Sequence, residues 1–112
     1  MKVYNFTHIR GDTYRGAIFT ITVNNEPLDL TNATILCQFK KSASFNPALT
    51  WTELNGITII NTPLHNQFKF NSQIIDIESG NYVYDIQITL NSGDVVTYIK
   101  GNLTLVESVS HV

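Results

Sequence analysis

Apolar and polar residues alternate along most of the chain, and this alternation predicts β-strands. The clearest case lies between residues 80 and 90, where every second residue is apolar or aromatic. That face contains Tyr82, Tyr84, Ile86, Ile88 and Leu90. Because successive side chains of a strand point to opposite faces, the pattern indicates a strand with one buried side. Helical periodicity is nearly absent, so we expect an all-β protein.

A second long alternating run predicts a hairpin at the C-terminal end. Residues 91–94 (NSGD) are typical of a turn, and the chain resumes as a strand over 95–106. One face of this strand is expected to hold Val95, Thr97, Ile99, Leu103 and Leu105. Gly101 lies within the strand, where a glycine often marks a bulge or a close backbone approach.

The first half of the chain shows the same pattern in shorter pieces. Alternation over 17–23 and 33–40 predicts two strands, and residues 41–50 (KSASFNPALT) are typical of a loop. Further short strands are expected at 3–8, 51–53, 56–61, 67–71 and 73–77. About seven or eight short strands indicate an antiparallel β-sandwich, and we expect one domain over residues 1–112.

Composition narrows the possible partners. Charged residues make up 14% of the chain, the net charge is −2, and Lys40-Lys41 is the densest basic point. Nucleic-acid binders normally show a basic stripe, because phosphate contacts supply much of their affinity, so we expect no nucleic-acid partner. The N-terminal residues lack the apolar core of a signal peptide, and no segment is long enough for a membrane helix. We therefore expect a soluble protein made in a cytoplasm, with no membrane partner.

Candidate catalytic and metal-binding residues are scattered along the sequence. His8, His65 and His111 have no further ligand at metal-binding spacing. Asp76 and Glu78 are the closest acidic pair and would form at most a weak cation site. No phosphate-binding glycine loop or nucleophile-elbow motif occurs. We expect no enzymatic activity, no cofactor and no metal.

Shorter features have simpler interpretations. Cys37 is the only cysteine, so no internal disulfide forms, and its place beside Ile35 and Phe39 on an apolar face predicts a core residue. The tripeptide at 10–12 (RGD) is expected to be a turn rather than an adhesion motif. Three glycosylation sequons, at 5–7, 32–34 and 102–104, are expected to stay unmodified.

The chain has more aromatic residues than one small core is expected to hold. Large aromatic side chains are favoured at interfaces, since they supply contact area with little loss of entropy. Together with two valines near the C-terminus, they give the candidate interface residues Tyr4, Phe6, Phe45, Trp51, Tyr98, Val106 and Val109. For Trp51 the alternative is a residue that covers the core from the end of a strand.

Two stretches resemble a known family. They are residues 29–33 (DLTNA) and 80–86 (GNYVYDI), followed by a turn at 92–94 and a strand ending at 98–105 (YIKGNLTL). In this order, over nearly the whole chain, they resemble the N-terminal Ig-like domain of the upper baseplate proteins of tailed bacteriophages. The resemblance implies an Ig-like β-sandwich that is part of a virion. This sequence lacks the helical or fibre-forming region that follows in those proteins, so tail, baseplate, neck and capsid-surface positions all stay open.

From these observations we expect a virion structural or adaptor protein that attaches to other virion proteins. Attachment would use sheet edges, loops and terminal arms at residues 3–8 and 107–112, in a homo-oligomer or symmetric assembly. The alternative is a carbohydrate-binding sandwich that contacts a host glycan through Trp51, Phe45 or Tyr98. A bacterial Ig-like adhesion module is a third hypothesis, which the missing signal peptide disfavours.

Overall fold

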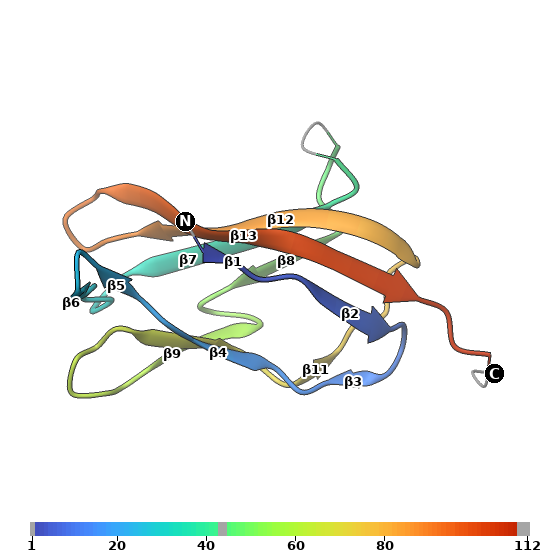
Figure 1. Ribbon diagram of the computed structural model, residues 1–112, viewed down its shortest axis with the longest axis horizontal. Helices are drawn as coiled ribbons and strands as arrows, with labels where there is room; N and C mark the ends of the chain where they lie inside the picture. The colour runs from blue at the N-terminus through green and yellow to red at the C-terminus, as the bar shows by residue number, and fades with distance from the viewer. Residues whose placement is uncertain (1, 43–44, 110–112) are drawn as a thin grey trace.

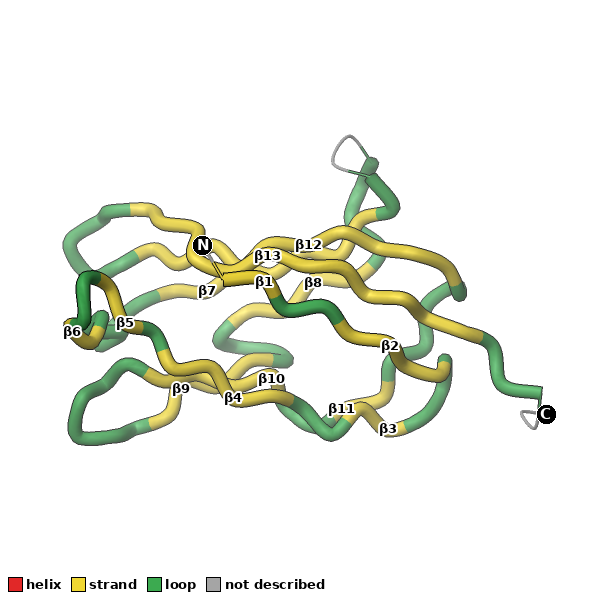
Figure 2. Tube along the Cα trace, in the orientation of Figure 1, coloured by secondary structure: helices red, strands yellow, loops and turns green. Residues whose placement is uncertain are grey.

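A computed structural model describes residues 2–42 and 45–109 and shows a two-layered, all-β architecture (Figures 1 and 2). The upper layer in Figure 1 is a six-stranded sheet, and the lower layer is built around a three-stranded sheet. The described residues contain no helix, and therefore none that is long and apolar enough to cross a membrane. The predicted fold class, an Ig-like β-sandwich, is confirmed.

The six-stranded sheet contains the longest strands. Its members are β1 (Lys2–Val3), β2 (Phe6–Ile9), β7 (Thr34–Lys40), β8 (Leu49–Thr52), β12 (Gly80–Thr89) and β13 (Val95–Val106). Their order is β1-β13-β12-β7-β8, and β2 also pairs with β13. The predicted C-terminal hairpin is the antiparallel pair β12–β13.

The second layer is shorter. Its three-stranded sheet has the order β4-β10-β9, formed by β4 (Ala17–Thr20), β9 (Ile57–Ile60) and β10 (Gln67–Phe70). Two small ladders lie at its ends in Figure 2, namely β3 (Thr13–Tyr14) with β11 (Gln73–Ile74), and β5 (Thr22–Val23) with β6 (Glu26–Pro27). Eight of the thirteen described strands have four residues or more, in line with the seven or eight expected.

The core between the layers consists of the faces that alternation predicts. Along β12, exposed and buried residues alternate without interruption, and Cys37 of β7 is 0% exposed. The largest fully buried side chains include Phe19, Phe39, Phe68, Phe70, Tyr82, Ile86, Ile88 and Ile99. Aromatic rings from both layers therefore form the interface that holds the sandwich together.

Strand β13 departs from the predicted alternation at a bulge. Ile86 pairs with Ile99, but Gln87 pairs with Thr97, so Tyr98 is the extra residue on β13. Residues before the bulge consequently change faces. Val95 was expected inside but is 56% exposed, because the extra residue shifts the pleat by one position.

A tyrosine near the start of β12 fixes the entry of that strand. Tyr82 is 1% exposed, and its hydroxyl donates a hydrogen bond to the main-chain carbonyl of Glu78. Ig-like sandwiches use this tyrosine corner at the equivalent strand. The Ig-like character of the fold therefore extends to a local contact.

The N-terminal segment runs parallel to β13, so the sandwich is not purely antiparallel. Lys2 pairs with Ile99 in β1, and Phe6 pairs with Leu103 in β2. Residues 3–8 were expected to form an attachment arm. They lie instead along the edge of β13, so they do not project as a free arm.

Between β1 and β2 the chain crosses Gly101. The Tyr4 N–H donates to the Lys100 carbonyl at 2.9 Å, and the Tyr84 hydroxyl donates to the Tyr4 carbonyl. A Cβ atom at position 101 would lie 1.8 Å from the Tyr4 carbonyl oxygen. Of the two alternatives at Gly101, a bulge or a close backbone approach, the structure shows the close approach, and only glycine fits there.

We expect Gly101→Ala to lower the free energy of unfolding by about 1–3 kcal/mol, because the added methyl group must displace the Tyr4 main chain. Urea unfolding measures the loss, and faster hydrogen exchange of the Tyr4 amide reports the displaced strand. The control is Gly93→Asn, at a turn position with nothing within 4 Å of an added Cβ. Equal exchange of the Tyr4 amide in both variants would contradict the expectation.

We expect Tyr82→Phe to cost about 1–2 kcal/mol of stability, since it leaves the Glu78 carbonyl without the hydroxyl that it accepts from. The matched control is Tyr98→Phe. Tyr98 is half-buried, and no hydrogen bond to its hydroxyl is seen among the described residues. Thermal or urea unfolding of both variants provides the comparison, and equal losses would disprove a stabilising corner.

Candidate functional site

The candidate metal-binding residues do not come together as a metal site in the described part of the chain. Residues 2–42 and 45–109 contain no group of three or more His, Cys, Asp and Glu side chains that could hold a metal ion. His111 lies outside the described residues. Asp76 and Glu78 contact different cations, Arg10 at 3.3 Å and Lys41 at 3.1 Å, rather than facing one shared ion.

The short motifs have structural roles. The RGD tripeptide is a turn after β2, as expected, where the Arg10 N–H donates to the Val106 carbonyl at 2.8 Å. The Arg10 side chain also lies 2.8 Å from the Glu107 carboxylate. Asn5 of the first sequon accepts a hydrogen bond from the Asn102 N–H through its side-chain oxygen at 2.9 Å, which helps to hold the N-terminal segment on β13.

Three buried groups are held in their neutral, protonated form. Burial raises the pKa of the Cys37 thiol, and the Asp85 carboxylate adds to that effect. Burial is also the largest cause of the raised pKa values of the Tyr14 and Tyr84 hydroxyls. A thiol held protonated is a poor nucleophile, so Cys37 has a packing role, as the sequence predicts.

These shifts predict that the protein becomes less stable at alkaline pH. A group with a raised folded-state pKa stabilises fully below its unfolded-state pKa, and that contribution is lost as pH rises. We expect the free energy of unfolding to fall by up to about 1.4 kcal/mol per pH unit for each group, beginning near pH 9 for Cys37 and near pH 10 for Tyr14 and Tyr84. Urea unfolding between neutral and alkaline pH measures the slope. Labelling of Cys37 by a thiol reagent should follow unfolding, and rapid labelling of the folded protein would contradict its burial.

Trp51 is not part of an exposed interface. It is 2% exposed and lies opposite Cys37 in the β7–β8 pair, so β8 directs it into the core. Its ring packs edge-on against Phe39 and Phe70, with ring centres 4.9 Å apart in both cases. The interface expectation for Trp51 is therefore corrected in favour of the core alternative. The carbohydrate-binding hypothesis also loses its strongest stacking platform.

Tyr4 and Phe6 connect the N-terminal strands to the second layer. The Tyr4 ring lies edge-on to Phe19 of β4 at 5.3 Å, and the Phe6 ring stacks on Tyr14 of β3 at 5.0 Å. Both side chains are half-buried and pack against the core. They close part of the gap between the sheets, and only their outer surfaces are available to a partner.

The remaining candidate interface residues lie at separate places. Phe45 is 57% exposed in the loop between β7 and β8. Val106 is 40% exposed and pairs with the equally exposed Ile9, and Val109 beyond them is fully exposed. The rest of the predicted C-terminal arm, residues 110–112, lies outside the described part of the chain. These residues form a loop site and an apolar end rather than one continuous patch.

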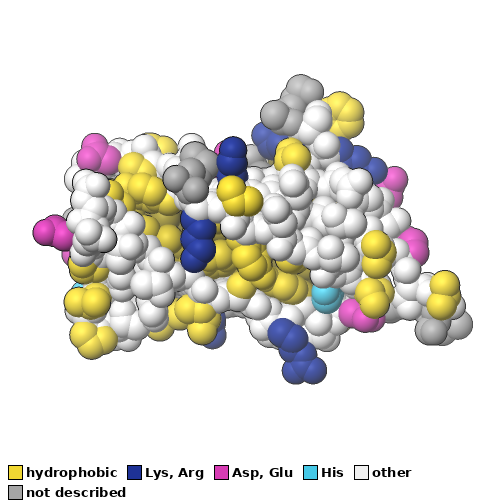
Figure 3. All heavy atoms as spheres, viewed as in Figure 1, with side chains coloured by type: hydrophobic (Ala, Val, Ile, Leu, Met, Phe, Trp, Pro, Cys, Tyr) yellow, Lys and Arg dark blue, Asp and Glu magenta, His cyan; other side chains and the backbone are white. Residues whose placement is uncertain are grey.

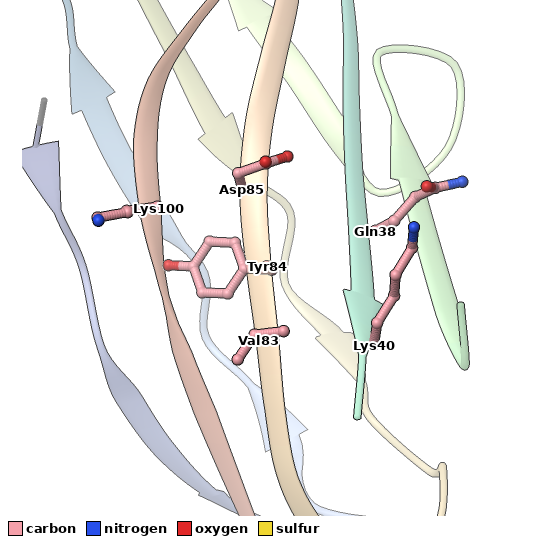
Figure 4. Close-up of a pocket in the computed structure, with 6 residues that line it drawn as sticks. All are labelled: Gln38, Lys40, Val83, Tyr84, Asp85 and Lys100. Atoms are coloured by element: carbon pink, nitrogen blue, oxygen red, sulfur yellow. The ribbon is translucent and has the colours of Figure 1, made fainter. Parts of the chain in front are cut away.

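A shallow depression lies on the outer face of the six-stranded sheet (Figure 4). It has a volume of about 320 Å³ and is lined by Gln38, Lys40, Val83, Tyr84, Asp85 and Lys100. Figure 4 shows the Lys100 side chain directed away from Asp85, and no ion pair links Asp85 to either lysine in the described structure. Tyr84 is only 5% exposed, so this face lacks an aromatic platform for a sugar ring.

The outer edge of β4 is uncovered in the described structure. Strand β4 pairs with β10 on one side and with no described strand on the other. The Ile21 N–H bonds to the Asn66 carbonyl at 2.9 Å on the β10 side. Because inward and outward backbone groups alternate in an antiparallel ladder, the N–H and C=O groups of Ile18 and Thr20 face the open edge.

A cleft borders this edge. It has a volume of about 270 Å³ and is lined by Lys2, Thr20, Ile21, Thr22 and Tyr98, from the N-terminal strand, the β4–β5 segment and β13. We call it the lateral cleft. Figure 3 shows a band of hydrophobic side chains between the two layers on this side of the molecule. Beside the edge, Ile18 is 66% exposed.

Alternation alone does not identify this edge, because it shows which face of a strand is buried and not which edge is paired. One signal was available in the sequence. Ile18 is an apolar residue on the otherwise polar face formed with Thr20 and Thr22. An exposed isoleucine on an edge strand is consistent with contact to another molecule.

Comparisons with known proteins give a fold and no family. No protein-family model and no curated protein matches the sequence. Among solved structures, the chain is similar to the crystal structure of CopC from Methylosinus trichosporium OB3b, with a TM-score of 0.51 and 10% sequence identity. The match covers 94% of this chain and 87% of that one. Similarity at this low identity shows a shared β-sandwich fold and says nothing about function.

Proposed function

We propose that this chain is a structural or adaptor protein of a tailed-bacteriophage virion. It attaches to other virion subunits, in the tail, baseplate, neck or capsid surface, as part of a symmetric assembly. The observation on which the proposal rests is the open β4 edge beside the lateral cleft. An edge with free backbone groups next to half-exposed aromatic residues suits attachment to another protein chain.

The residues that give the phage resemblance have clear places in this sandwich. In the stretch 29–33, the Asp29 carboxylate accepts hydrogen bonds from the Thr31 N–H at 2.9 Å and the Thr31 hydroxyl at 2.6 Å. This turn places Leu30, which is 0% exposed, in the core ahead of β7. The stretch 80–86 is the first part of β12 and includes the tyrosine corner. The stretches that carry the resemblance therefore stabilise the sandwich itself, and the resemblance is what supports a virion role.

The surface chemistry favours packing between subunits over catalysis. Charged residues form only 14% of the chain, so little charge must be desolvated when subunits pack closely. Exposed apolar residues lie at the β4 edge, the 41–48 loop and the C-terminal end, as shown by Ile18, Phe45 and Val109. These separate contact points would allow a small protein to bind more than one neighbouring subunit.

The proposal predicts that the chain is a stoichiometric part of phage particles. Immunogold electron microscopy with antibodies against the purified chain, applied to density-banded particles from cultures that produce it, should label one fixed position. Mass spectrometry of the same particles should find the chain at a constant ratio to the capsid protein. A chain that stays in the particle-free fraction, and labels no particle, would rule the proposal out.

A further inference from the structure

We infer that the outer edge of β4 accepts an extended, acidic strand from a partner protein, which pairs with β4 and places side chains in the lateral cleft. This inference rests on the proposed function, because it names the partner chemistry for the same edge.

The backbone of β4 provides the first part of the argument. The outward N–H and C=O groups of Ile18 and Thr20 have the spacing of one strand ladder, and no described strand pairs with them. On the β13 side, the corresponding position is already filled by the chain's own N-terminal strands. The chain's own strands thus occupy the β13 side of the lateral cleft, whereas β4 has no described strand on its outer side; β8 and β9 are the outermost strands at the other ends of the two sheets.

The lateral cleft provides the second part. A strand added to β4 would direct alternate side chains toward the space between the layers, where Ile21 and Tyr98 line the cleft. The half-buried rings of Tyr4 and Phe6 lie farther along the same gap. Alternate side chains of the partner would therefore pack against a mixed lining, in which the aromatic ring of Tyr98 lies beside the polar side chains of Lys2, Thr20 and Thr22.

Charge provides the third part and identifies the partner as acidic. The segments around the edge and the cleft are residues 2–9, 13–23, 66–71 and 96–101, and none contains Asp or Glu, although Asp12 adjoins the second segment and Glu26 pairs with Val23 at its end. They contain Lys2, Arg15, Lys69 and Lys100, in a chain whose net charge is −2. Figure 3 agrees, since Lys and Arg side chains lie on and beside the hydrophobic band while most carboxylates lie toward the two ends.

The same charges disfavour edge-to-edge pairing of two identical chains. Two β4 edges brought together would bring Lys2, Arg15 and Lys69 of both copies into the same interface. Each exposed ion pair with an acidic partner contributes little affinity by itself, about 0–1 kcal/mol. Backbone pairing and apolar burial would provide the affinity, and charge would select the partner.

The test uses three synthetic peptides of about eight residues, a typical strand length, with blocked ends and valine at alternate positions. The intervening positions hold Glu in one peptide, Gln in the second and Lys in the third. Binding is followed by NMR shifts and hydrogen-exchange protection of the Ile18 and Thr20 amides. We expect the Glu peptide to protect both amides and to bind roughly tenfold more tightly than the Lys peptide, as two or three ion pairs would give.

A matched pair of variants separates backbone pairing from side-chain contact. Ile18→Pro removes an N–H that faces the open edge and leaves the β4–β10 ladder intact, whereas Ile18→Thr removes the same side chain and keeps the N–H. We expect the proline variant to lose binding of the Glu peptide and the threonine variant to retain most of it. Unchanged spectra of β12 and β13 confirm that both variants are folded.

A charge-reversed variant, Lys2→Glu with Lys69→Glu, keeps the test valid if Ile18→Pro does not fold. It should reverse the preference, so that the Lys peptide binds more tightly than the Glu peptide. Equal binding of all three peptides would overturn the inference, and so would the absence of protection at Ile18 and Thr20. A dimer that protects these amides without peptide would assign the edge to a second copy, and would also overturn it.

The outcomes for this edge and for the virion role are separable. If the Glu peptide protects the β4 amides but the chain is absent from phage particles, the proposed virion role is disproved and acidic-strand binding at the β4 edge is still supported. If the chain is a fixed part of phage particles but no peptide protects its β4 amides, only the inference about the β4 edge is disproved.

Discussion

The contact between the Tyr4 main chain and Gly101 determines how the edges of this molecule are used. The missing side chain at Gly101 lets the N-terminal strand approach β13, and the Tyr84 hydroxyl holds the Tyr4 carbonyl in place. The same contact directs Tyr4 and Phe6 toward the second layer, where their rings pack on Phe19 and Tyr14. Because the N-terminal residues lie along β13, they are not available to cover β4.

The resulting asymmetry between edges connects the fold to attachment. An uncovered edge strand invites pairing with other chains, and natural proteins limit that risk with short strands and nearby lysines. Strand β4 has both features, with four residues and Lys2 and Lys69 beside it. Such an edge resists its own copies, yet it stays open to a strand of opposite charge. In an assembly with fixed partners, this selectivity would make an edge that is otherwise prone to aggregation a specific binding site.

The aromatic residues show why composition alone gives an ambiguous view of function. Trp51 and Phe39 pack in the middle of the core, while Phe45 is exposed in a loop only a few residues away in sequence. All three belong to the class that is enriched at interfaces. Their different positions follow from strand register, because β8 directs Trp51 inward and the loop gives Phe45 no sheet to pack against.

The sequence by itself determined the fold class, the buried faces of β7 and β12 and the C-terminal hairpin, and it marked Gly101 as a bulge or a close approach. These features follow from alternation and from glycine, which act locally along the chain. Only the tertiary structure decided the parallel course of residues 3–8, the bulge at Tyr98, the burial of Trp51 and the open edge of β4. Each depends on which strand lies beside which. That pairing joins residues far apart in sequence, whereas a strand shows the same alternation whether its edge is paired or open.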